Sequence, residues 1–278
     1  MGKAVTVPAT GYLKVPGATL HYQVCGTGPT LLIIQGGARD ADRAAAFAKQ
    51  LAPAYRVVTY DRRGLSRSRL DDPAQAVNIE VHGEDAHRLL AALTGEPAFV
   101  VGSSLGALIA LDLMGTHPEQ VRMLVAHEPI AAELLDEPER GRLRAGQREL
   151  ETSFRHDGIF VAIAKLAAMT GDADTADPGA GKAADLQFFL GNDAAAARRY
   201  TLKLSTLRAA AGRIVPGAGI GSRGRLLHRC AEGLAGRLHR PLVEFPGGHS
   251  GYVFVPDAFA ATLQAILAGS APSRSQTT

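Results

Sequence analysis

The chain alternates between short apolar runs and longer amphipathic stretches. Residues 30–35 (TLLIIQ) are almost continuously apolar, which is typical of a strand covered on both faces in a parallel sheet. Runs of the same kind recur at 56–60, 98–102, 121–127 and 242–245. Segments with helical character lie between them, at 42–51, 79–93, 105–117, 224–238 and 257–267. This alternation predicts an α/β fold with a mostly parallel sheet and helices on both faces.

Two segments depart from this alternation of buried strands and helices. Residues 19–24 (TLHYQV) alternate with period 2, which predicts a half-exposed strand at an edge of the sheet. After Pro129 the strand pattern stops, and helical stretches follow until the strand pattern resumes at 213–219 (RIVPGAG). We therefore predict a core in two parts, a helical cap inserted over it, and a disordered polar tail; the expected boundaries are 1–130 and 212–268 for the core, 131–211 for the cap and 269–278 for the tail.

The composition limits the domain size, the partners and the cellular location that we expect. The chain has 278 residues, of which 46% are hydrophobic, enough to bury the core of one large domain. Its 30 basic and 27 acidic residues are spread without long runs, so we expect neither a nucleic acid nor a membrane as partner. Two cysteines, Cys25 and Cys230, are too few for a disulfide framework, and the first residues contain no apolar signal segment. These features predict a cytoplasmic protein.

A candidate nucleophile lies at Ser104. Gly102-Ser103-Ser104-Leu105-Gly106 matches the pattern G-x-S-x-G directly after a predicted strand and before a predicted helix. Glycines flank the serine because so tight a turn leaves no room for side chains. The turn would hold the Ser104 hydroxyl at a helix N-terminus, where free N–H groups favour developing negative charge.

Several motifs occur in a fixed order along the chain: QGG at 35–37, YDRRGLSRS at 60–68, GSSLG at 102–106, HEP at 127–129 and PGGHSGY at 246–252. In these motifs and their order the chain resembles the α/β-hydrolase family over residues 12–267. The resemblance implies an eight-stranded, mostly parallel sheet with a cap inserted after the sixth strand, which is where the predicted cap lies.

The resemblance also implies a general base. His249 lies in a glycine-rich loop after the last predicted strand, and it would take the proton of Ser104 during attack. His127 is a second candidate, although its position at a strand end beside Glu128 suits a structural hydrogen bond equally well.

The same resemblance implies an oxyanion hole made by the backbone N–H groups of Leu105 and Gly37. Many relatives have His-Gly where this chain has Gln35-Gly36, a modest difference because the backbone supplies the donor. Asp61 and Arg62 are expected to brace the loop beneath the site.

The acid of the family's triad has no counterpart at its usual place. It follows the seventh strand in the family, where this chain has Gly219, Ile220, Gly221 and Ser222. Three interpretations remain: Glu128 serves as the acid from the end of the sixth strand, Glu244 does so, or a dyad of serine and histidine works without an acid.

Three functions are compatible with these residues. The first is a serine hydrolase acting on an ester, thioester or lactone of a small molecule. The second is a cofactor-free lyase or cyclase in which His249 removes a proton and the oxyanion-hole N–H groups stabilise an enolate. The third is a non-catalytic ligand-binding protein. No Rossmann fingerprint, P-loop or metal motif occurs, so we expect no cofactor and no metal, and a small-molecule substrate as the partner.

Overall fold

The strands of the protein form one mostly parallel sheet. The computed structural model describes residues 8–171 and 179–269. Within these residues the sheet has nine strands in the order β1-β2-β4-β3-β6-β7-β8-β9, with β5 paired to β2 beside this path. The strands are β1 (Ala9–Val15), β2 (Ala18–Cys25), β3 (Thr30–Ile34), β4 (Arg56–Tyr60), β5 (Arg69–Leu70), β6 (Ala98–Ser103), β7 (Val121–His127), β8 (Ile214–Gly219) and β9 (Val243–Phe245). Every pairing from β4 to β9 is parallel, as predicted, and the two-residue β5 is the strand beyond the expected eight.

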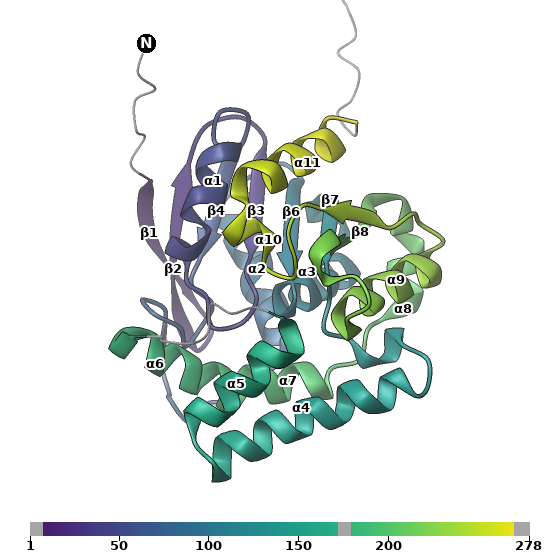
Figure 1. The fold of residues 1–278 in the computed structure, drawn as a ribbon. Helices are drawn as coiled ribbons and strands as arrows, with labels where there is room; N and C mark the ends of the chain where they lie inside the picture. Colours follow the sequence, from purple (N-terminus) through teal and green to yellow (C-terminus); the bar gives the residue numbers. More distant parts are fainter. Residues whose placement is uncertain (1–7, 172–178, 270–278) are drawn as a thin grey trace, which may run out of the picture.

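Helices cover both faces of this sheet (Figure 1). They are α1 (Ala45–Leu51), α2 (Ile79–Leu93), α3 (Leu105–Thr116), α9 (Leu226–Leu238), α10 (Gly251–Phe254) and α11 (Pro256–Ala268). The fully buried strand β3 shows how the two layers form, because its side chains alternate between them. Leu31 and Ile33 pack into the cluster that contains α1 and α11, whereas Leu32 and Ile34 pack into the cluster that contains α2, α3 and α9.

The prediction of an edge strand at 19–24 is wrong. β2 lies between β1 and β4 and pairs with both of them in antiparallel fashion. β1 and β2 form a hairpin closed by Pro16 and Gly17, and Gly17 adopts φ +76. The alternating pattern of β2 therefore reflects partial burial of its faces, while β1 takes the edge position.

A helical insertion separates β7 from β8. Its described helices are η3 (Ala132–Leu134), α4 (Glu139–His156), α5 (Ile159–Thr170), α6 (Gly179–Phe188), the π-helix η4 (Phe189–Asp193), α7 (Ala194–Arg199), α8 (Leu204–Ala209) and η5 (Ala211–Arg213). Figure 1 shows α4, α5, α6 and α7 gathered at one end of the sheet. The insertion contacts the segment after β4, where the backbone N–H of Ser66 donates to Asp185 over 2.6 Å.

The insertion lies where the cap was expected, and the division into core and cap at 131–211 stays a prediction. Residues 172–178 of the predicted cap, and the predicted tail beyond Gly269, lie outside the described residues. None of the helices in the described ranges has the length and apolar character needed to cross a membrane.

Candidate active site

Ser104 sits at a strained turn between a buried strand and a buried helix. β6 ends at Ser103 and α3 begins at Leu105, so Ser104 alone makes the turn, with φ 58 and ψ −119. A positive φ is unfavourable for a serine and costs on the order of 1–3 kcal/mol, a strain that the surrounding structure must hold in place. The turn amide is held by a hydrogen bond of 2.9 Å from Ser104 N–H to the carbonyl of His127. The predicted strand, turn and helix are therefore all present.

Glycines allow the backbone to close around this turn. A Cβ atom on Gly106 would lie 2.0 Å from the carbonyl oxygen of Ile34, and one on Gly36 would lie 2.7 Å from Cβ of Ser104. Both distances are far shorter than any real contact, so the loop after β3 packs directly against the serine. This explains why G-x-S-x-G and the QGG segment occur together in the sequence.

His249 contacts a buried carboxylate. Its Nδ1 atom lies 2.7 Å from Oε2 of Glu128, and both side chains are buried. An ionised carboxylate can only accept a hydrogen bond, so the Nδ1 atom carries the ring proton when the imidazole is neutral. The Nε2 atom is then the basic nitrogen.

Glu128 is anchored at the end of β7 by the loop after β8. It adopts φ 47, and its backbone N–H donates to the carbonyl of Gly217 over 2.9 Å. Its Oε1 atom accepts hydrogen bonds from the backbone N–H of Gly219, at 2.8 Å, and from the hydroxyl of Ser222. The positions where the family's usual acid was expected thus supply donors to a carboxylate that comes from the neighbouring strand.

These contacts keep Glu128 ionised. Burial is the strongest single influence and would raise its pKa, but the hydrogen bond from His249, the neighbouring His127 and the hydroxyl of Ser222 act in the opposite direction and lower the pKa to about 2. Because the pKa is lowered relative to the unfolded chain, the ionised carboxylate stabilises the fold above its ordinary pKa, and this contribution is lost as the pH falls toward 2.

The two other candidates from the sequence occupy different positions. Glu244 forms an ion pair with Arg223 at the surface, so it does not provide the contact to His249. His127 is fully buried and its ring meets those of Phe245 and Phe259 edge-on, at centroid distances of 5.6 and 5.2 Å. Its surroundings fit a structural role.

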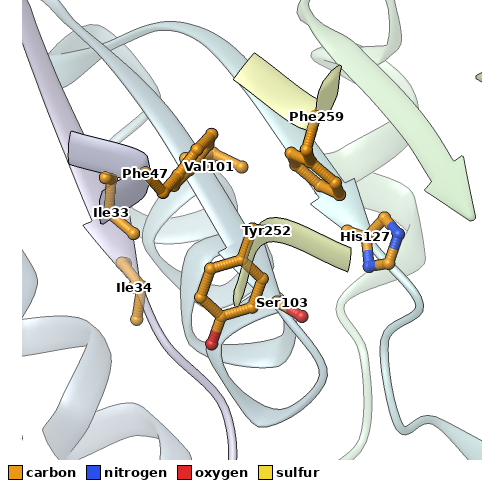
Figure 2. Close-up of a pocket in the computed structure, with 8 residues that line it drawn as sticks. All are labelled: Ile33, Ile34, Phe47, Val101, Ser103, His127, Tyr252 and Phe259. Atoms are coloured by element: carbon orange, nitrogen blue, oxygen red, sulfur yellow. The ribbon is translucent and has the colours of Figure 1, made fainter. Parts of the chain in front are cut away.

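Figure 2 shows the residues that line a small cavity, among them His127 and Ser103. Its other lining residues are apolar or aromatic: Ile33, Ile34, Phe47, Val101, Tyr252 and Phe259. The cavity measures about 10 Å³, which is room for about one water molecule. It is too small for a substrate.

The two predicted oxyanion donors lie in the loops that meet at Ser104. Leu105 is the first residue of α3, so its N–H has no acceptor within the helix. Gly37 follows β3 and adopts φ 57, next to the Gly36 backbone that packs against Ser104. Neither N–H donates to a protein acceptor in the described part of the chain, so both can serve an incoming oxygen.

Arg62 holds the loop that carries Gly37. Its guanidinium donates to the carbonyl oxygens of Gln35, at 2.6 Å, and of Gly37. The same group pairs with Asp193 of the helical insertion, with 3.0 Å between Nη2 and Oδ2. The other oxygen of Asp193 lies 3.1 Å from Nε2 of His82. The bracing role expected for Arg62 is present, and it extends into the insertion.

Asp193 and His82 are buried residues behind the candidate site that the sequence did not reveal. Asp193 is the last residue of the π-helix η4 and is fully buried. Burial alone would raise the pKa of its carboxyl group, but the contacts with His82 and Arg62 have the larger effect and lower that pKa. Nothing in the segment GNDAAAA marks its aspartate as a buried partner. The π-helix could not be inferred from the hydrophobic pattern either. A single π-helical turn holds one residue more than an α-helical turn, and this extra residue leaves the amino-acid composition of the segment unchanged.

Replacing Asp193 by asparagine is expected to destabilise the fold by about 3 kcal/mol, because it leaves the charge of Arg62 buried without compensation. Chemical denaturation measures this change. The control is Glu149→Gln, which removes an exposed ion pair with Lys165 and should cost less than about 1 kcal/mol. Equal losses in the two variants would show that the buried pair contributes no more than a surface pair.

Comparisons with known proteins agree with this architecture. Residues 29–158 match the family model described as the alpha/beta hydrolase fold. The chain is 39% identical over 261 residues to YraK, an uncharacterized hydrolase of Bacillus subtilis (strain 168), covering 92% of this chain and 95% of that protein. Two solved structures share the fold at low sequence identity. A thermophilic esterase from Thermogutta terrifontis has a TM-score of 0.74 and 16% identity, covering 95% of this chain and 99% of that one. A hydrolase from Pseudomonas aeruginosa PA01 has a TM-score of 0.71 and 22% identity, covering 93% and 98%.

Proposed function

Because this chain belongs to the α/β-hydrolase family, we propose that it is a serine hydrolase that cleaves an ester, thioester or lactone of a small molecule through Ser104. His249 is the general base and Glu128 is the acid that orients it. The observation that carries the proposal is the 2.7 Å contact between Nδ1 of His249 and the buried carboxylate of Glu128. Through this contact Glu128 supplies the acid that is missing after the seventh strand, where the family usually carries it.

The reaction follows from the protonation states of these groups. The Ser104 oxygen attacks the carbonyl carbon while its proton passes to Nε2 of His249, which is the basic nitrogen. The N–H groups of Leu105 and Gly37 stabilise the negative charge that develops on the carbonyl oxygen. His249 then returns the proton to the leaving group, and a water molecule, activated by the same nitrogen, releases the acyl group from Ser104.

The second and third functions rested on the apparent lack of an acid. The contact between the ionised carboxylate of Glu128 and the imidazole of His249 supports the first function over these two. Proton abstraction by His249 without an acyl-enzyme would instead predict that Ser104→Ala keeps a turnover that His249→Ala loses.

Labelling of the full-length protein with a fluorophosphonate tests the proposal. Such probes react with serines activated by a neighbouring base, so we expect one adduct, which mass spectrometry locates on Ser104. Ser103→Ala is the matched control, because Ser103 is the adjacent hydroxyl and ends β6; its labelling should match that of the unmodified protein. A folded protein that stays unlabelled, or is labelled elsewhere, contradicts the proposal.

A further inference from the structure

A cluster of metal-binding side chains lies at the far end of α3 from Ser104. Glu84 and His87 are three residues apart on α2 and therefore share one face of that helix, and His117 caps the C-terminus of α3. Their ligand atoms all lie within 4.8 Å of one another, and in the described ranges they form the one group of three or more such residues that does so. Since Ser104 precedes α3 and His117 follows it, the rise of about 1.5 Å per residue separates the two by about 20 Å.

The two histidine rings are stacked face to face, so they must turn about their side-chain bonds for both to point a nitrogen at one ion. They stack with 3.7 Å between centroids and 10° between planes, and the Nε2 atom of His117 lies 2.8 Å from Oε1 of Glu84. The side chains of Glu84 and His117 are 40% and 22% exposed, so an ion can reach them from solvent.

The His87 ring has a hydrogen-bond partner at its other nitrogen. The Nδ1 atom of His87 lies 2.9 Å from the amide oxygen of Gln120, which fixes the proton on Nδ1 and leaves Nε2 with its lone pair. The Nδ1 atom of His117 lies 3.7 Å from a carboxylate oxygen of Glu119, which is too far for a hydrogen bond in this structure. Ligating histidines in proteins commonly donate their second N–H to such an oxygen, which orients the ring and makes the ligating nitrogen more basic.

We propose that Glu84, His87 and His117 form a Zn²⁺ site that joins α2 to α3. Two imidazole nitrogens and one carboxylate oxygen are ligands that Zn²⁺ accepts, with a water molecule in the fourth position. The ion takes the place of the proton between Glu84 and His117, and that proton moves to Nδ1 of His117, facing Glu119. Arg88 contacts the other oxygen of Glu84 at 3.2 Å and leaves Oε1 for the metal, but its charge weakens the affinity. The site is separate from the hydrolytic one.

Isothermal titration of chelator-treated, tag-free protein with Zn²⁺ tests the site. We expect one equivalent to bind and the unfolding temperature to rise with the Zn²⁺ concentration, because the ion binds the folded chain. His87→Gln and His117→Gln should each lower the affinity at least tenfold. Gln120→Ala should lower it by about 10-fold or more, because it removes the oxygen that orients His87.

His156→Gln is the matched control, because His156 is an exposed histidine on α4 outside the cluster. It should keep the full affinity, and fluorophosphonate labelling or circular dichroism verifies that each variant is folded. Binding that persists in His87→Gln, or that is lost in His156→Gln, would overturn the proposal, as would the absence of any Zn²⁺ binding to the unmodified protein.

Discussion

Replacing Ser104 by alanine is expected to lower kcat for ester hydrolysis by about 10⁵- to 10⁶-fold, the loss found when a serine hydrolase loses its nucleophile. The Ser104 hydroxyl is the atom that would bond to the acyl group, and Ser104 is the residue that makes the turn between β6 and α3. Hydrolysis of p-nitrophenyl acetate by matched amounts of folded protein measures the change.

Ser103→Ala is the control for this experiment and should keep its rate within a few-fold, since the Ser103 hydroxyl belongs to the strand and not to the turn. If Ser104→Ala keeps its turnover of a substrate while His249→Ala loses it, the protein does not use an acyl-enzyme. That result would favour the lyase or cyclase chemistry in which His249 alone transfers the proton.

Replacing Glu128 by glutamine is expected to lower kcat by about 10⁴-fold, the effect of neutralising the corresponding acid in a serine protease. Glutamine has nearly the same shape and can still accept the hydrogen bonds of Gly219 and Ser222. Its amide group, however, would donate to Nδ1 of His249, so the ring proton would move to Nε2 and the base would be lost.

Glu244→Gln is the matched control, because Glu244 is the other carboxylate considered for this role and pairs with Arg223. Its kcat should stay within a few-fold of the unmodified protein. A larger loss in Glu244→Gln than in Glu128→Gln would reverse the assignment. Acid unfolding provides a second readout: since the pKa of Glu128 is about 2, the unmodified protein should lose stability between about pH 4 and pH 2, and Glu128→Gln should lose less over that range.

Much of the fold could be predicted because each central strand is covered on both faces. The predicted ranges 56–60 and 121–127 coincide with β4 and β7, and 79–93 coincides with α2. Continuous apolar runs mark such strands whatever their neighbours are. The position of β2 could not be inferred in the same way, because a half-buried pattern shows which faces are covered and does not show how many strands lie alongside.

Part of the candidate site could likewise be predicted from the sequence, and part could not. Ser104 could be found from the sequence because glycines at fixed spacing are required by its turn. The choice between Glu128 and Glu244 could not be made, because it depends on the direction of a side chain. Glu128 turns toward His249 through a positive φ just beyond β7, and Glu244 points outward from β9 to the surface. Asp193 stayed hidden because its partners, Arg62 and His82, are distant in sequence.

The pairing of Arg62 with Asp193 restricts how the helical insertion can be exchanged. A chimera with the helical insertion of another hydrolase would still bury the guanidinium of Arg62 beneath the new insertion. That insertion would have to place a carboxylate at the position of Asp193. Without one, the loss of the partner would cost about 3–5 kcal/mol, a large share of the stability of a typical domain. Recombination between relatives should therefore preserve stability when the two residues are transferred together, and loop grafting that ignores them should yield chains of lower stability.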